Sequence, residues 1–228
     1  MREVKIAPSV LAYDLTNLRG AVDIAAKGGA DLLHLDVIDG HFAPNITFGS
    51  GTIDALRHTT RMKFDVHLMI NQPRRHVHDF LDAGADIVIF QVETVDMAVF
   101  DALFAIARSY KKEVGLALKP ETDLPKWVES RLDRLRTILV LTVQPGFSGQ
   151  RMDVSQFPKI ERINKLVTER GLDIDIEIDG GIGLPNIGEV ARRGGNSFVA
   201  GAGVYATPNP VEAISKLREA AIAARSGI

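Results

Sequence analysis

The 228-residue sequence contains no cysteine. This absence excludes disulfide bonds, iron–sulfur clusters and catalysis by a thiolate. It also leaves any bound metal ion to histidine and carboxylate ligands.

An excess of basic residues is missing as well, since 27 Lys and Arg face 29 Asp and Glu, for a formal net charge of −2. A nucleic-acid partner is therefore not expected, because its binding surface needs a basic excess or stripe. The longest apolar runs are only as long as a β-strand, so no membrane span is expected. The N-terminal stretch Met1–Lys5 leads straight into a strand-like run, without the apolar core of a signal peptide. A cytoplasmic location is the default expectation.

The residues that are present have an ordinary balance, 46% hydrophobic and 25% charged, as in soluble globular proteins. A chain of 228 residues is long for one average domain but common for a single α/β barrel.

Short β-branched or aliphatic runs alternate with longer segments of helical periodicity, eight times over. The expected strands are Val4–Ser9, Leu32–Val37, Lys63–Leu68, Ile87–Gln91, Glu113–Leu118, Thr137–Thr142, Ile174–Asp179 and Ser197–Ala200. The expected helices include Leu15–Lys27, Arg74–Ala83, Asp96–Tyr110, Gln156–Arg170 and Pro210–Ala224.

Glycine and proline mark the junctions. Gly28-Gly29, Gly84 and Gly194-Gly195 suit the left-handed residue that ends a helix before the next strand. Pro185 and Pro210 are expected in the first turns of helices.

Strict strand–helix alternation predicts parallel strands with helices outside. Eight repeats without a linker favour a closed (β/α)8 TIM barrel, a single domain over residues 1–228, rather than a six-stranded open sheet with extra elements. The active site of such a barrel lies at the C-terminal ends of the strands.

Two histidines and two aspartates stand at those ends. His34 and Asp36 share one face of the second expected strand, His67 holds the equivalent place on the third, and Asp179 ends the seventh. A lone histidine on a strand is more often a hydrogen-bonded residue than a ligand, but four such positions together suit Zn²⁺, Mn²⁺, Fe²⁺ or Co²⁺. The other histidines lack this placement and are expected on loops or helix surfaces: His41, His58, His76 and His78.

Three glycine-rich stretches follow the last three expected strands: Gln144–Gln150, Asp179–Ile182 and Ala200–Gly203. Glycines let backbone N–H groups approach an anion, and the loops after strands seven and eight of such barrels often bind phosphate. The sequence therefore favours a phosphorylated ligand.

Five motifs are spread over nearly the whole chain: Ala7–Ala12, His34–Asn45 (HLDVIDGHFAPN), Asp65–Met69 (DVHLM), Thr142–Gln150 (TVQPGFSGQ) and Glu177–Ile182 (EIDGGI). In these motifs the chain resembles the ribulose-phosphate 3-epimerase family.

The resemblance implies one divalent metal ion per subunit, Zn²⁺ as the first choice, held by His34, Asp36, His67 and Asp179. It implies that Asp36 and Asp179 are the acid and the base. Ser9 and His67 would contact the sugar. The rest of the substrate and its phosphate would lie against Gly146, Phe147, Ser148, Gly149, Gly180, Gly181, Gly201 and Ala202. The family also generally forms homo-oligomers.

The chemistry of epimerisation agrees with this set of groups. Inverting C3 of a 2-ketose means removing a proton next to the carbonyl and returning one from the other face. A metal ion can stabilise the enediolate charge, and two carboxylates suffice for the proton transfers. The loop Pro145–Met152 contains two glycines and is expected to close over the substrate.

Departures from the family pattern leave the substrate open between ribulose 5-phosphate and another ketose phosphate, such as allulose 6-phosphate. The family usually has Met, His, Asn, Met, Gly and Ser, in that order, where this chain has Ile38, Gln91, Lys119, Leu141, Ser148 and Ala202.

Two further classes are weighed. A metal-independent decarboxylase or aldolase on a related barrel would need an Asp-x-Lys-x-x-Asp array, and His34–Asp39 contains no lysine. A non-catalytic phosphosugar-binding protein would not need two opposed aspartates.

Overall fold

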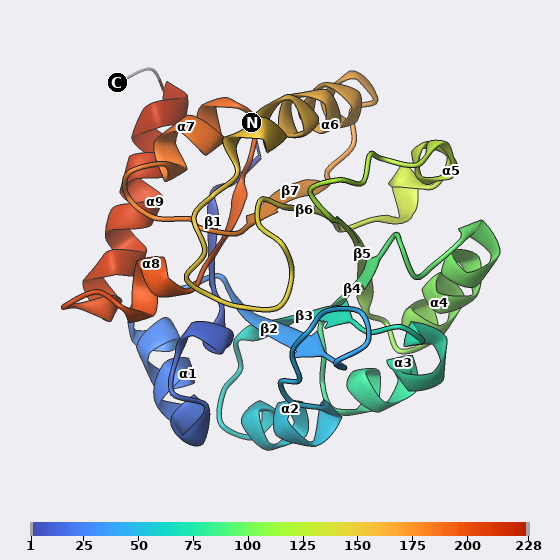
Figure 1. Ribbon diagram of the computed structural model, residues 1–228, viewed down its shortest axis with the longest axis horizontal. Coiled ribbons are helices and arrows are strands. Elements are labelled where there is room, and N and C mark those ends of the chain that lie inside the picture. The colour runs from blue at the N-terminus through green and yellow to red at the C-terminus, as the bar shows by residue number, and fades with distance from the viewer. Residues whose placement is uncertain (1, 227–228) are drawn as a thin grey trace.

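The computed structural model describes residues 2–226, and within them eight strands form one parallel sheet that curls into a barrel. In Figure 1 the strands surround the centre of the view and the helices form the outer ring. The strands are β1 Lys5–Pro8, β2 Leu32–Ile38, β3 Lys63–Met69, β4 Ile87–Gln91, β5 Glu113–Leu118, β6 Thr137–Leu141, β7 Asp175–Asp179 and β8 Ser197–Ala200. Each lies within one residue of its expected bounds at either end, so the predicted (β/α)8 TIM-barrel fold is confirmed.

The strands pair in the order β1-β8-β7-β6-β5-β4-β3-β2, always in parallel. Between β1 and β2, which would complete the circle, the strand pairing within residues 2–226 shortens to a single bridge of Ser9 with His34. The barrel is therefore nearly closed, with its weakest seam between its first two strands.

The helices lie outside the barrel. The long ones match the expectation: α1 Leu18–Lys27, after a short 3-10 turn at Leu15–Asn17, α3 Pro73–Asp82, α4 Met97–Ser109, α6 Phe157–Glu169 and α9 Pro210–Ser226. Pro210 is the first residue of its helix, as expected, whereas Pro185 lies in the turn before α7. The shorter helices were not among those expected, because four to eight residues give no reliable periodicity: α2 Ser50–Arg57, α5 Lys126–Glu129, α7 Ile187–Arg192 and α8 Ala202–Tyr205.

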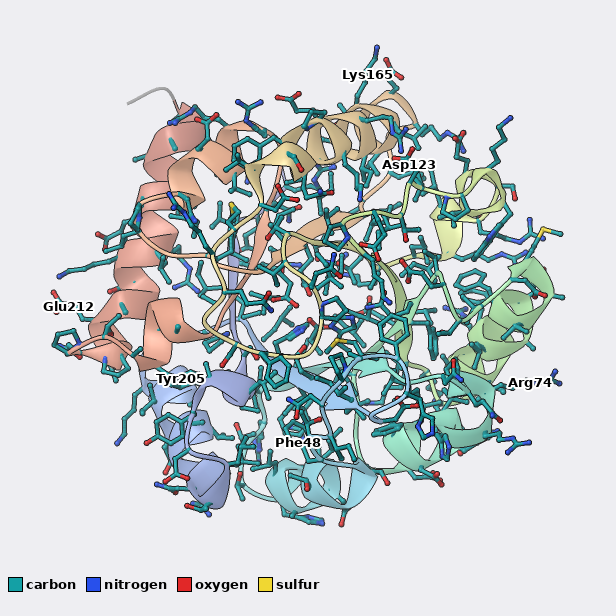
Figure 2. All side chains as sticks on the ribbon, viewed as in Figure 1. Phe48, Arg74, Asp123, Lys165, Tyr205 and Glu212 are labelled. Atoms are coloured by element: carbon teal, nitrogen blue, oxygen red, sulfur yellow. The ribbon has the colours of Figure 1, made fainter. Side chains whose placement is uncertain are left out.

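Two apolar clusters hold these layers together, and a third, small one joins Ile38, Ala43 and Met69 at the ends of β2 and β3. Alternate strand residues such as Phe64, Val66 and Phe90 point outward and pack under the helices. A smaller cluster fills the barrel interior: Ala7, Leu32, Ile87, Ile89, Ala117, Leu139, Leu141 and Val199. Charged side chains project from the outer ring, as Figure 2 shows for Arg74, Asp123, Lys165 and Glu212. Buried polar side chains, among them His34, Asp36 and His67, lie in the barrel interior beside this cluster.

The same helix-to-strand junction recurs at the N-terminal ends of several strands. Gly29, Gly84 and Gly194 have positive φ, as expected for helix ends. The residue two positions later, Asp31, Asp86 or Asn196, begins the return to the sheet. Its side chain accepts a hydrogen bond from the backbone N–H of a neighbouring strand. The pattern of Gly-x-Asp or Gly-x-Asn therefore fixes helix ends and strand edges together.

Candidate active site

The two histidines and two aspartates singled out in the sequence converge at the C-terminal ends of β2, β3 and β7. Asp36 Oδ1 lies 3.2 Å from His34 Nε2 and 3.3 Å from His67 Nδ1. Asp179 Oδ2 lies 4.0 Å from each of the same two nitrogens. The ligand atoms of all four residues lie within 4.8 Å of one another.

This donor set fits a divalent cation. Two imidazole nitrogens and two carboxylate oxygens are common zinc ligands, at about 2.0–2.1 Å from the metal, which puts neighbouring ligand atoms of a tetrahedral site roughly 3.3 Å apart. The contacts of Asp36 are already close to that spacing, and Asp179 needs to move by less than an ångström. His34, Asp36, His67 and Asp179 could therefore hold one metal ion.

Strand register explains why these residues meet. Asp36 of β2 stands opposite His67 of β3 in the parallel pairing. His34 lies two residues before Asp36, so both side chains point into the barrel. Asp179 is the last residue of β7 and reaches the cluster from the opposite wall.

A second polar layer lies directly beneath the first. His34 Nδ1 is 2.9 Å from Asp65 Oδ2 and 3.6 Å from Glu177 Oε1, while Ser197 Oγ donates to Glu177 Oε2 at 2.8 Å. All of these side chains are buried. Asp65 and Glu177 begin two of the motifs noted in the sequence but were given no role there, although each stands two residues before a predicted ligand and therefore points inward too.

Burial and charge set the protonation of the cluster. Burial alone would lower the pKa of His34, but the Asp36 and Asp65 carboxylates raise this pKa well above its usual range. Asp36 is equally buried, but the two histidines lower its pKa. Burial and the Asp36 charge raise the pKa of Asp179 to about 6, and burial and Asp65 raise that of Glu177 well above its usual range. The two aspartates thus differ in proton affinity within one site, as acid and base pairs do.

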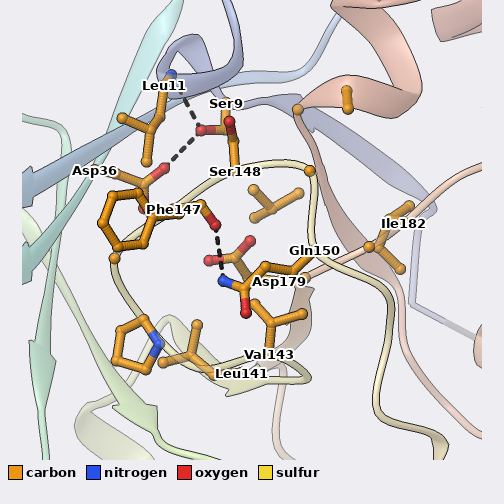
Figure 3. A pocket seen from close by; sticks show the side chains of 18 of the residues that line it. Ser9, Leu11, Asp36, Leu141, Val143, Phe147, Ser148, Gln150, Asp179 and Ile182 are labelled. Carbon is orange, nitrogen blue, oxygen red and sulfur yellow. Dashed lines mark hydrogen bonds between the residues drawn. The ribbon is translucent and has the colours of Figure 1, made fainter. Parts of the chain in front are cut away.

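A cavity of about 200 Å³ opens above the cluster, between the strand ends and the β6–α6 loop (Figure 3). Asp36 and Asp179 face it, and Ser9 Oγ donates to Asp36 Oδ2 at 2.6 Å. Its apolar wall includes Leu11, Met69, Leu141 and Val199. The other predicted substrate contacts that line it are Gly146, Phe147, Ser148, Gly149, Gly180, Gly181, Gly201 and Ala202. His67 lies outside this lining, beneath the carboxylates.

Close backbone packing shapes one end of the cavity. Gly181 has φ of +65°, and a Cβ there would stand 2.5 Å from the backbone nitrogen of Met152. A Cβ on Gly203 would stand 2.2 Å from the carbonyl oxygen of Ile182. Because only glycine fits these contacts, the loops after β7 and β8 present backbone rather than side chains to a ligand.

The positions that depart from the family pattern fall into two groups. Leu141, Ser148 and Ala202 line the cavity. Lys119 does not, because its ammonium lies 4.0 Å from the centre of the Phe42 ring. Gln91 is buried against His67, and Ile38 is buried beside Ala43 and Met69, outside the cavity lining. The histidines that the sequence placed on surfaces are all exposed there: His41, His58, His76 and His78.

Comparison with known proteins gives a consistent result. Residues 5–205 match the model of the ribulose-phosphate 3 epimerase family. The chain is 39% identical to a ribulose-phosphate 3-epimerase of Synechocystis sp., over 95% of this chain and 94% of that protein. It is 38% identical to one of Bacillus subtilis, over 94% and 98%.

Solved structures show the same architecture at lower identity. The 3-hexulose-6-phosphate synthase of Salmonella typhimurium matches with a TM-score of 0.72 and 17% identity, over 96% of this chain and 98% of that one. The 3-keto-L-gulonate-6-phosphate decarboxylase of Vibrio cholerae matches with a TM-score of 0.71 and 14% identity, over 97% and 98%. At such identities the likeness concerns the fold alone. Among residues 2–226, no helix combines the length and apolar character needed to cross a membrane.

Proposed function

Because the chain belongs to the ribulose-phosphate 3-epimerase family, and is therefore an isomerase, we propose that it converts D-ribulose 5-phosphate to D-xylulose 5-phosphate with one bound divalent metal ion. The observation that carries the proposal is the pair of carboxylates, Asp36 and Asp179, that face one small cavity beside two buried imidazoles.

The bound ion would supply positive charge that stabilises the enediolate oxygens, and His34, Asp36, His67 and Asp179 would hold it. The protein supplies the proton transfers. One aspartate removes the C3 proton on one face of the sugar, and the other returns a proton from the opposite face, so that C3 is inverted. Zn²⁺ is our first choice of metal, and Fe²⁺, Mn²⁺ and Co²⁺ accept the same ligands.

The remaining cavity residues bind and enclose the sugar phosphate in this proposal. Ser9, hydrogen-bonded to Asp36, would orient that carboxylate and contact the sugar. The glycine-rich loops would offer backbone N–H groups to the phosphate. The β6–α6 loop would exclude water from the enediolate.

A hexulose phosphate such as D-allulose 6-phosphate is the second candidate. Leu141 and Ala202 of the cavity wall depart from the family pattern and so favour a test of this substrate. The cavity of about 200 Å³ is smaller than the usual range for ligand sites and favours the shorter sugar.

The first experiment follows exchange of the C3 proton in D₂O by NMR, with metal-reconstituted protein and ribulose 5-phosphate. We expect exchange and formation of xylulose 5-phosphate. Asp179→Asn should slow both by about 10²- to 10⁴-fold, as for loss of a general acid or base. Asp123→Asn, whose side chain is 81% exposed, is the matched control and should behave as the wild type.

Allulose 6-phosphate is run in parallel. Exchange with this sugar alone would keep the mechanism and change the substrate. No exchange with either sugar by metal-loaded protein would contradict the proposal and leave either a binding protein or an enzyme for another phosphosugar.

We also propose a cytosolic homo-oligomer. Light scattering after size-exclusion chromatography measures the number of subunits.

A further inference from the structure

Gln91, the last residue of β4, is wholly buried against the candidate metal cluster. Its side-chain amide nitrogen lies 2.7 Å from His67 Nε2. Among residues 2–226 the imidazole of His67 is the only hydrogen-bond partner of this amide, and the amide oxygen is buried without one. The position of the proton on the His67 imidazole therefore decides whether the Gln91 amide must turn its nitrogen or its oxygen toward the ring.

Each histidine of the cluster uses its two nitrogens differently. His34 directs Nε2 toward the aspartates and Nδ1 toward Asp65, at 2.9 Å. His67 does the reverse, with Nδ1 toward Asp36 at 3.3 Å and Nε2 toward Gln91 at 2.7 Å. The nitrogen remote from the cluster thus has a partner in both rings, an anionic carboxylate in one and a neutral amide in the other.

Metal binding through Nδ1 of a neutral imidazole leaves the proton on Nε2, which then needs an acceptor. The amide oxygen of Gln91 is such an acceptor, and a half-turn of the amide brings it to the place that the nitrogen now holds. With the amide nitrogen toward Nε2, His67 carries its proton on Nδ1 and donates toward Asp36, a state that cannot bind a metal ion through Nδ1.

We propose that Gln91 is a positioning residue that selects the tautomer of His67. Its carbonyl oxygen accepts the Nε2 proton of His67 and so directs the Nδ1 lone pair toward the metal. When no metal is bound, the amide turns and donates to Nε2. This inference rests on the proposed metal-dependent function, but it concerns metal affinity rather than turnover.

The test compares Zn²⁺ affinity in three variants, by competition with a chelating dye and without any sugar. Gln91→Met keeps the size of the side chain and removes both polar atoms, and we expect about 10- to 100-fold weaker binding, the usual effect of losing a partner of a ligand histidine. Gln91→Glu keeps an acceptor and should restore affinity to within a few-fold of wild type. Ile89→Met, on the same inward face of β4, controls for altered packing and should not change it.

Nitrogen-15 NMR of the histidine rings gives an independent readout. In the wild type we expect the proton of His67 on Nε2 when zinc is bound and on Nδ1 when it is not. In metal-free Gln91→Met we expect a mixture of the two tautomers. A purely structural role for Gln91 would lower thermal stability without changing this signal.

Any of four results would overturn the inference. Gln91→Met could bind zinc as tightly as the wild type, or Ile89→Met could lose as much affinity as Gln91→Met. Gln91→Glu could fail to recover affinity, or the wild-type protein could bind no zinc at all. Zinc binding that depends on Gln91 in a protein that does not epimerise the sugars would uphold it while contradicting the proposed function. Epimerisation together with zinc binding independent of Gln91 would do the opposite.

Discussion

Asp36 and Asp179 show how neighbours rather than residue type set the behaviour of a buried carboxyl group. Ser9, His34 and His67 all lie within hydrogen-bond reach of Asp36, and the histidines stabilise its charge. Asp179 stands farther from both rings, so burial and the nearby Asp36 charge raise its pKa to about 6. In the metal-free protein, ionised Asp179 is a cost to folding that a bound cation would remove.

Replacing Asp179 with Asn should therefore stabilise the metal-free protein in a pH-dependent way. The folded-state pKa of Asp179 is raised, so the folded protein holds the proton of this carboxyl group more tightly than the unfolded chain does. The stability that this proton contributes is fully present below the unfolded pKa and is lost as the pH rises through about 6. At about pH 8, Asn should add on the order of 2 kcal/mol, which is roughly 4–8 °C in Tm. At about pH 4 the gain should shrink toward zero.

Thermal unfolding of chelator-treated protein, followed by circular dichroism, measures this effect. Asp123→Asn again serves as control. An equal change in Tm at both pH values would show that the charge of Asp179 is not its cause.

Gly181 is a second position at which a single residue sets the shape of the cavity. Gly181→Ala would place a Cβ at φ of +65° and 2.5 Å from Met152 N, so the backbone after Gln150 must move. We expect the KM for the sugar phosphate to rise about tenfold, since small misplacement of binding groups is costly.

Gly29→Ala is the matched control. Gly29 has φ of +69°, a Cβ added there would meet nothing within 4 Å, and the residue lies away from the cavity. The variant should lose about 1 kcal/mol of stability from backbone strain and keep the wild-type KM. Equal KM values for the two variants would mean that the Gly181 contact does not shape the substrate site.

Among the elements, the β6–α6 loop has the most direct relation to the cavity. In Figure 1 this yellow segment crosses the centre of the view, over the strand ends. The Gln150 side chain donates to the carbonyl oxygens of Gln144 and Phe147, at 2.7 and 2.8 Å, and Asn45 donates to that of Gly146. Phe147 at the tip is 57% exposed. A few side-chain hydrogen bonds therefore hold an exposed loop in place.

Gln150→Ala should loosen the loop without unfolding the barrel. We expect kcat/KM to fall about tenfold, because an open loop admits water and orients the substrate poorly. Hydrogen exchange of residues 145–152 should become faster while Tm changes little. Gln72→Ala, an exposed glutamine that caps no helix through its side chain, is the control. Unchanged kinetics in Gln150→Ala would exclude a role for this bracing in catalysis.

The long elements were predictable and the short ones were not. Strands such as β4, Ile87–Gln91, are short runs of β-branched and aromatic residues, and α4 has thirteen residues of amphipathic pattern. The four residues of α8 include the small residues Ala202 and Gly203 and are too few to show a helical period. Short helices of this kind depend on the sheet for their conformation.

For the whole molecule, the seam between β1 and β2 is the place where the barrel closes. Asp31 N–H donates to Ile6 O at 3.0 Å, and Asp31 Oδ2 accepts from Ile6 N–H at 2.8 Å. Arg218 of α9 pairs with the same carboxylate at 2.6 Å. Asp86 makes the same two contacts with Phe64, but there β3 and β4 also share a regular ladder.

Asp31→Ala and Asp86→Ala should each lower stability by about 1–3 kcal/mol, because a buried N–H loses its acceptor. At roughly 2–4 °C per kcal/mol, the fall in Tm is readily measured by calorimetry. Only Asp31→Ala should also speed hydrogen exchange in β1, since that seam has little other pairing. The same exchange pattern in both variants would contradict a special role of Asp31 in closure.

The sequence by itself determined the strands, the alternation that makes a barrel, and the four residues at its mouth. Periodicity and local motifs carry that information because they depend on neighbours along the chain. It did not reveal the layer of Asp65 and Glu177, the contact of Gln91 with His67, or the position of Lys119 over Phe42. These contacts join residues of different strands and loops, and only closure of the barrel decides the register and the facing that bring them together.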